Sequence, residues 1–160
     1  MKYRIGQGLD IHPFAAGRRL VLGGVEIPHS RGLEGHSDAD ALLHALTDAL
    51  LGAAGLGDIG THFPNTDEAW KGASSRRLLT LAWQKISALG WKIENLDMTL
   101  LAEEPKISPY ISAMKQAISE SLSIDVEQIG IKASTTERLG FVGRGEGVLA
   151  SCVALLSCEV

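Results

Sequence analysis

The strongest constraint on the fold is an apolar run near the end of the sequence. Residues 147–157 read Gly-Val-Leu-Ala-Ser-Cys-Val-Ala-Leu-Leu-Ser and contain no charged side chain. Successive side chains of a strand point to opposite faces, so a strand with this composition is apolar on both faces. Such strands are usually covered on both sides. We therefore expect a sheet with protein packed on each of its faces.

Length and charge narrow the possible classes of protein. The chain has 160 residues, which suits one domain over residues 1–160. Its net charge is −4, which argues against a nucleic-acid binder held by a broad basic face. An anionic ligand must then be held by local groups, such as backbone N–H groups, a few basic side chains or a metal ion.

The cysteines and the N-terminal sequence indicate the compartment. Cys152 and Cys158 are six residues apart on the predicted last strand, on one face but too far apart to bond to each other. We interpret them as buried thiols in a reducing compartment, with a disulfide or a metal pair as alternatives. The sequence shows no signal-peptide pattern and no apolar run of transmembrane length. We expect a cytoplasmic protein with no membrane partner.

Periodicity and turn residues predict an α/β (α+β) fold. Strands are expected at 3–9, 96–102, 129–133 and 147–157, with two short strands within 19–27 joined by Gly23-Gly24. Helices are expected from an N-cap at Ser37 to about residue 54, at 75–89 and at 108–122, with long loops at 56–72 and 134–146. This order predicts a mixed four-stranded sheet plus a small hairpin, with helices on one face. The other face then needs a partner, which favours an oligomer.

Three residues form a candidate metal site. Asp10 and His12 are two apart on a strand, so their side chains point the same way, and His44 follows on the next helix. One carboxylate and two imidazoles suit Zn²⁺ with an open coordination position. Alternatively, Asp-x-His is a turn or a surface pair. Asp40 and Asp48 lie four residues on either side of His44, and we expect one of them to bond its far ring nitrogen. They could instead be solvated charges.

Two polar segments near this site are candidates for substrate binding. Residues 35–38 precede a helix, where backbone N–H groups attract anions and His36 and Ser37 add donors; the alternative is a plain helix cap. Residues 57–60 and 63–67 are polar and contain Gly, Pro and Asn, as in a loop that closes over a substrate. An ordinary surface loop would look similar.

Three more segments follow strands. Backbone N–H and C=O groups of residues 102–108 can form hydrogen bonds with the edge of a nucleotide base, and Lys106 can reach a phosphate. Alternatively, this segment is a simple connector. Residues 134–137, Ser-Thr-Thr-Glu, suit a Mg²⁺-bound diphosphate, or they are a Ser/Thr-rich strand end. Residues 140–147 contain four glycines around Arg144 and Glu146, which indicates tight turns that hold a charged pair.

Taken in order, these segments resemble the 2-C-methyl-D-erythritol 2,4-cyclodiphosphate synthase family of the non-mevalonate isoprenoid precursor pathway. Each motif is weak alone, but all of them occur in order at matching spacing over essentially the whole chain. The resemblance rests on residues 8–12, 36–40, 44–53, 57–60, 63–64, 105–106, 135–137 and 143–147.

The resemblance implies an assembly and a set of cofactors. It implies a homotrimer whose sheets pack around the three-fold axis, with active sites between neighbouring subunits. One Zn²⁺ per subunit would be bound by Asp10, His12 and His44. Glu137 would help to hold a second divalent cation, Mg²⁺ or Mn²⁺. His36 and Thr135 would be catalytic, stabilising the transition state.

The resemblance also implies substrate contacts. Residues 102–108 would form the cytosine pocket, residues 134–137 would lie near the phosphates of the cytidine diphosphate group, and residues 58–60 and 63–67 would contact the methylerythritol part. The full implied set is Asp10, Ile11, His12, His36, Ser37, Asp58, Ile59, Gly60, Phe63, Pro64, Asn65, Thr66, Asp67, Ala102, Glu103, Glu104, Pro105, Lys106, Ile107, Ser108, Ser134, Thr135, Thr136, Glu137, Phe141 and Arg144.

The implied activity is that of a lyase. The substrate would be 4-diphosphocytidyl-2-C-methyl-D-erythritol 2-phosphate, whose 2-phosphate attacks the β-phosphorus and releases CMP. Zn²⁺ and Mg²⁺ would neutralise the phosphates, and intramolecular positioning would supply much of the rest. Two alternatives stay open: a zinc-dependent phosphoester hydrolase, and a non-catalytic trimeric module that binds cytidine nucleotides.

Overall fold

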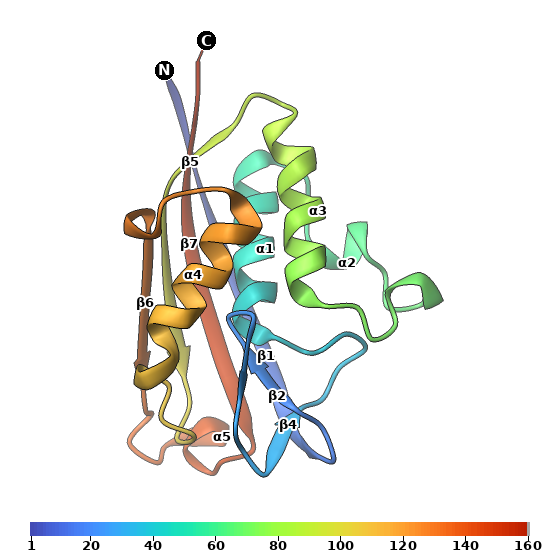
Figure 1. Ribbon diagram of the computed structural model, residues 1–160, viewed down its shortest axis with the longest axis vertical. Helices are drawn as coiled ribbons and strands as arrows, with labels where there is room; N and C mark the ends of the chain where they lie inside the picture. The colour runs from blue at the N-terminus through green and yellow to red at the C-terminus, as the bar shows by residue number, and fades with distance from the viewer. Residues whose placement is uncertain (160) are drawn as a thin grey trace.

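The computed structural model describes residues 1–159, and over these residues the chain forms a five-stranded mixed sheet and a separate two-stranded hairpin (Figure 1). The order in the large sheet is β4-β1-β7-β5-β6; β5 and β6 are parallel, and the other neighbours are antiparallel. The strands are β1 (Lys2–Ala16), β2 (Leu20–Leu22), β3 (Val25–Ile27), β4 (Arg31–Leu33), β5 (Lys92–Leu101), β6 (Ile129–Ser134) and β7 (Gly147–Cys158).

The helices cover one face of the sheet (Figure 1). The α-helices are α1 (Ala41–Ala54), α2 (Ile59–His62), α3 (Ser75–Ser87), α4 (Ile111–Leu122) and α5 (Gly140–Gly143), and 3-10 turns span Glu68–Trp70, Ser108–Tyr110 and Val126–Gln128. Helix α1 lies on β1 and β7, and α3 packs against α1 and α4. Among the residues described, no helix has the length and apolarity needed to cross a membrane.

The predicted fold class is confirmed, with two corrections to the sheet. Over residues 1–159 it has five strands rather than four, because the short strand β4 pairs with the far end of β1. Three residues are too few to show an alternating pattern. Strand β1 also continues past the predicted end at residue 9, because it pairs with β7 as far as Pro13 and then with β4.

The first long helix begins later than predicted, and the long loops contain short helices. Asp40, not Ser37, is the N-cap of α1. Ala39 has a φ of 57°, which is incompatible with a helix running through it. The predicted third helix starts as a 3-10 turn before α4, and the predicted loops contain α2 and α5. Helices of four residues are too short to be recognised from apolar periodicity.

Asp40 ties the β2–β3 hairpin to the start of α1. Its fully buried carboxylate accepts hydrogen bonds from the N–H groups of Gly23 (2.9 Å), Gly24 (2.7 Å) and Leu43 (3.0 Å). Burial raises the pKa of Asp40 to about 6, although these bonds oppose the shift. The hairpin is thereby held over the end of α1 that carries His44.

We expect this raised pKa to appear in the stability of the protein. The contribution of Asp40 is fully present below its ordinary pKa of 3.8 and is lost as the pH rises through about 6. The free energy of unfolding should therefore fall with rising pH by up to about 3 kcal/mol from this group. Urea unfolding of the wild type and of Asp40→Asn between pH 4 and 7 should show that the stability of the wild type relative to the variant falls as the pH rises, because Asn does not ionise. A constant difference would contradict this prediction.

Helix α1 packs directly on the backbone of β1. A Cβ atom at Gly6 would lie 1.9 Å from the carbonyl oxygen of Ala49, and one at Gly8 would lie 1.8 Å from that of Ala45. Only glycine permits this approach. An apolar stripe of α1 is buried, with members that are at most 2% exposed: Leu42, Leu46, Ala49, Leu50 and Ala53. The close contact fixes the distance between β1 and the side chains of α1.

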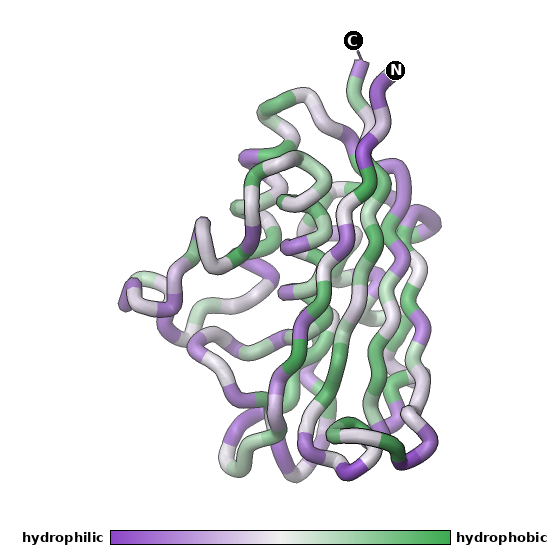
Figure 2. Tube along the Cα trace, turned by 180° about the vertical axis from the view of Figure 1, so that it is seen from behind, coloured by the Kyte–Doolittle hydropathy of each residue, from purple (hydrophilic) through white to green (hydrophobic). Residues whose placement is uncertain are grey.

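No helix covers the face of the sheet opposite α1 (Figure 2). Strand β7 buries Val148, Ala150, Cys152, Ala154 and Leu156 beneath the helices. The large apolar side chains exposed on the two central strands are Tyr3, Ile5, Leu9, Ile11 and Val153, which are 42–72% exposed. The prediction of a strand that is apolar on both faces is confirmed. A row of exposed aromatic and aliphatic side chains is typical of a surface that packs against another protein.

The two cysteines do not bond to each other. Both thiols are free; Cys152 is buried as predicted, whereas Cys158, near the end of the described residues, is only partly buried. Burial raises the pKa of Cys152 to about 12 and keeps its thiol protonated.

Candidate metal centre and substrate cleft

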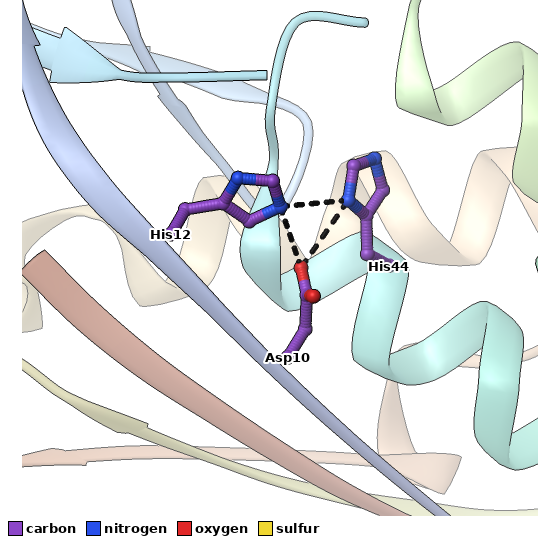
Figure 3. A group of neighbouring side chains, drawn as sticks. All are labelled: Asp10, His12 and His44. Carbon is purple, nitrogen blue, oxygen red and sulfur yellow. Dashed lines mark hydrogen bonds and ion pairs between the residues drawn. The ribbon is translucent and has the colours of Figure 1, made fainter. Parts of the chain in front are cut away.

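Asp10, His12 and His44 converge on one point (Figure 3). The first two project from the same face of β1, and the third comes from the first turns of α1. Asp10 Oδ2 lies 2.9 Å from His12 Nε2 and 3.2 Å from His44 Nδ1, and the two ring nitrogens are 3.2 Å apart. Ligands of a tetrahedral Zn²⁺ with bonds of 2.0–2.1 Å are separated by roughly 3.3 Å. The three atoms therefore have nearly the spacing of three corners of such a site.

The hydrogen bonds on the far side of each ring determine its tautomer. His12 Nδ1 is 2.6 Å from the carbonyl oxygen of Glu34, which only accepts, so Nδ1 carries the hydrogen and Nε2 keeps a lone pair. His44 Nε2 is 2.9 Å from Ser75 Oγ, and the Ser75 hydroxyl donates to Asp38. Ser75 Oγ therefore accepts from His44 Nε2–H, and His44 Nδ1 keeps its lone pair.

The arrangement suits a divalent cation. Among residues 1–159, Asp10 Oδ2 is the one buried side-chain oxygen or nitrogen without a hydrogen-bond partner, because neither nitrogen that faces it carries a hydrogen. Burial opposes ionisation of Asp10, but hydrogen bonds and positive charge from His12 and His44, when their rings are protonated, outweigh it and lower its pKa. Burial likewise opposes protonation of His12, but Asp10 outweighs it and raises the pKa of His12. The site thus attracts positive charge, and its three lone pairs could hold a divalent cation.

The prediction that Asp40 or Asp48 orients His44 is wrong. Asp40 accepts only backbone N–H bonds, and Asp48 accepts from the N–H of Ile59 at 2.7 Å. Asp38 and Ser75 take this role instead, with Ser37 Oγ also 3.1 Å from His44 Nε2. Helical spacing cannot reveal Ser75, because it is 31 residues away on α3.

A cleft of about 430 Å³ opens beside the three ligands. Ten predicted site residues line it: Asp10, His12, His36, Ser37, His44, Ile59, Gly60, Phe63, Pro64 and Asn65. Trp70 and Leu78 also line it and were not predicted. Trp70 packs edge-on against Phe63, with ring centroids 5.0 Å apart. The sequence signal for this side of the cleft was the presence of two aromatic residues, Phe63 and Trp70, in an otherwise polar segment.

Several predicted residues of the same segments do not line the cleft. Asp58 caps α2 through Thr61, and Asp67 caps the turn that follows, so both carboxylates hold the loop in shape. Thr66 is exposed outside the lining. Ile11 points to the uncovered face of the sheet, because it alternates with Asp10 and His12 along β1.

The remaining predicted residues gather at another edge of the sheet. Strands β5 and β6 are parallel and Leu101 pairs with Ser134, so residues 102–108 and 134–137 leave the sheet side by side. Ala102 N–H donates to Ser134 O at 3.1 Å, and Thr135 Oγ1 lies 3.1 Å from Glu137 Oε1. The two segments predicted to hold the nucleotide are therefore adjacent. Lys106 and Glu137 are exposed there.

The predicted charged pair is present beyond the short helix α5. Arg144 Nε donates to Glu146 at 2.7 Å, and both side chains are more than half exposed. Phe141 lies on α5 itself. Over the described chain, none of residues 102–108 or 134–144 lines the cleft beside the metal ligands. A single chain thus presents two separate groups of predicted site residues.

The sequence matches the model of the YgbB family over residues 3–157. The chain belongs to the YgbB family. A relative from Shouchella clausii, named 2-C-methyl-D-erythritol 2,4-cyclodiphosphate synthase, is 57% identical over 153 residues, which are 96% of either chain. The metal ligands and the cleft thus occur in a chain whose YgbB-family relatives include named enzymes.

Solved structures agree with this membership of the YgbB family. The bifunctional IspDF from Campylobacter jejuni matches with a TM-score of 0.95 and 43% identity, covering 99% of this chain and 43% of that longer one. The Plasmodium falciparum IspF structure in complex with CDP matches with a TM-score of 0.87 and 35% identity, covering 99% and 97% of the two chains. The predicted fold and family are confirmed.

Proposed function

We propose that this chain is a 2-C-methyl-D-erythritol 2,4-cyclodiphosphate synthase. It would close 4-diphosphocytidyl-2-C-methyl-D-erythritol 2-phosphate into the cyclic diphosphate and release CMP. The observation that carries the proposal is the convergence of Asp10, His12 and His44 beside a cleft, in a chain 57% identical to a relative with this name. The CDP held by the Plasmodium falciparum structure supports a cytidine nucleotide as ligand.

The reaction exchanges one phosphorus–oxygen bond for another. An oxygen of the 2-phosphate bonds to the β-phosphorus, and the bond from that phosphorus to the bridging oxygen breaks, so that CMP leaves with this oxygen. The attacking phosphate is already ionised, so no general base is needed. The nucleophile and its target belong to one molecule, and the protein gains most by holding them in line. We therefore assign the loops to positioning.

The proposed function involves two divalent cations. Asp10, His12 and His44 would hold Zn²⁺, and Glu137 would help to hold Mg²⁺ or Mn²⁺. When bound, these ions supply positive charge that reduces the repulsion between the attacking and accepting phosphates. His36, at the cleft wall, and Thr135, beside Glu137, would donate hydrogen bonds to the phosphoryl oxygens as charge develops.

The proposed assembly is a homotrimer with its active sites between subunits. The cleft that holds the metal ligands receives no residue of 102–108 or 134–144 from its own chain. A second copy can supply these segments, and the exposed apolar side chains of β1 and β7 offer a surface on which copies can pack. Residues 58–60 and 63–67 of one subunit would then contact the methylerythritol part, while residues 102–108 and 134–137 of its neighbour would hold the cytosine and the phosphates.

Phosphorus NMR of the product, combined with metal analysis, tests the proposal. The purified protein, incubated with the cytidyl substrate and Mg²⁺, should yield the cyclic diphosphate and CMP in equal amounts and contain about one zinc per chain. Inorganic phosphate or a ring-opened product would indicate a phosphoester hydrolase. Binding of CDP without turnover in the zinc-loaded protein would indicate a binding module. Either result would contradict the proposal.

A further inference from the structure

One oxygen of Glu103 holds the turn that carries Glu137. Glu103 Oε1 accepts hydrogen bonds from Thr136 N–H at 3.0 Å and from Arg138 N–H at 3.2 Å. Thr136 Oγ1 also lies 3.2 Å from this oxygen, although its hydroxyl is closer to the carbonyl oxygen of Leu139, at 2.8 Å. The partial burial of Glu103 opposes ionisation, but the bonds from Arg138 and Thr136 outweigh it and lower its pKa. The carboxylate is thus an ionised acceptor at neutral pH, and its bonds are charge-assisted.

The turn that Glu103 holds has an unfavourable backbone conformation. Glu137 and Arg138 have φ angles of 53° and 64°, and two consecutive residues with side chains rarely occupy this left-handed region. Such a conformation persists only where the surroundings impose it. Residues 136–138 therefore need external contacts to keep their shape.

The opposite side of the turn is also held. A Cβ atom at Gly143 would lie 2.1 Å from the carbonyl carbon of Arg138, so the short helix α5 packs directly on the backbone of the turn. Leu139 N–H also donates to Thr136 O at 3.0 Å. The turn is fixed between Glu103 on one side and Gly143 on the other.

We propose that Glu103 is a positioning residue, which holds residues 136–138 so that Glu137 can take the second divalent cation. This inference rests on the proposed function, and it differs from the expectation that Glu103 contacts the substrate. Oε1 accepts from two backbone N–H groups of the turn itself. Glu103 also lies in the segment proposed to hold the cytosine, so its bonds connect the base-binding segment to the phosphate-binding turn.

The test compares Glu103→Ala, Glu103→Gln and the control Glu127→Ala in the zinc-loaded full chain. Glu127 is exposed on a 3-10 turn outside both segments and loses the same charge. Hydrogen exchange of the Thr136 and Arg138 amides and Mn²⁺ binding in the presence of CDP, followed by electron paramagnetic resonance, are the two measurements. Neither needs turnover, so failure of the proposed reaction would not obscure the result.

In Glu103→Ala, we expect both amides to exchange at least about tenfold faster and Mn²⁺ to bind about tenfold more weakly, with zinc content unchanged. Glu103→Gln should restore most of the protection, because its amide oxygen still accepts, and Glu127→Ala should match the wild type. Unchanged exchange in Glu103→Ala, or faster exchange with unchanged Mn²⁺ binding, would overturn the proposal. Absence of Mn²⁺ binding to the wild type would overturn it as well.

Discussion

Replacement of His44 by Ala should abolish CMP release while leaving the fold and the assembly intact. His44 supplies one of three lone pairs at the metal site, and its ring is near the cleft surface, with 13% of the side chain exposed. Loss of one of three protein ligands should remove the ion and the positive charge it places beside the phosphates. We expect turnover to fall by roughly a thousandfold or more. Zinc content, CMP release and size-exclusion chromatography measure the three parts of this prediction.

Two further variants control the interpretation. Ser75→Ala keeps all three ligands but removes the nearer of the two hydroxyls beside His44 Nε2–H, so it should weaken zinc binding by about 10–100-fold and recover activity when zinc is added. Asp48→Asn should keep the wild-type zinc content, because Asp48 bonds only to the backbone of Ile59. Normal turnover by His44→Ala that is free of zinc would disprove the metal assignment.

Gly8→Ala should be among the most destabilising single substitutions in this chain. The new methyl group would lie 1.8 Å from the carbonyl oxygen of Ala45 and 2.9 Å from the backbone nitrogen of Ala49. Both neighbours are backbone atoms of α1, so no side-chain rotation can relieve the overlap, and the helix must move away from β1. We expect the free energy of unfolding to fall by roughly 3–5 kcal/mol, as measured by urea denaturation.

The same displacement should affect the metal site, because His44 lies on α1 and its two partners lie on β1. Zinc affinity should therefore fall together with stability. Gly52→Ala is the matched control: Gly52 lies in the same helix, and a Cβ atom there has no neighbour within 4 Å. That variant should be more stable than the wild type by about 0.5–1 kcal/mol, because alanine favours the helix. Wild-type stability of Gly8→Ala would show that α1 and β1 are less closely packed than described.

Much of the fold and the metal site could be predicted from local pattern. Asp10 and His12 face the same way because side chains alternate along a strand. This relation holds however the strand packs against the rest of the protein. The apolar stripe of α1 and the two-faced apolar β7 follow from periodicity in the same way. The N-cap at Asp40 was missed because Ser37 is an equally good capping residue and the left-handed backbone of Ala39 has no sequence signal.

The sequence by itself determined which kinds of ligand atom are available, the order of the long strands and helices, and the family to which the motifs belong. Only the tertiary structure decided which atoms are in contact. Ser75 and Asp38 set the tautomer of His44, and Glu103 accepts hydrogen bonds from the turn that carries Glu137. These contacts join residues 31–37 positions apart. Their geometry depends on how α1, α3 and the strand ends pack, and packing distances are not encoded in local periodicity.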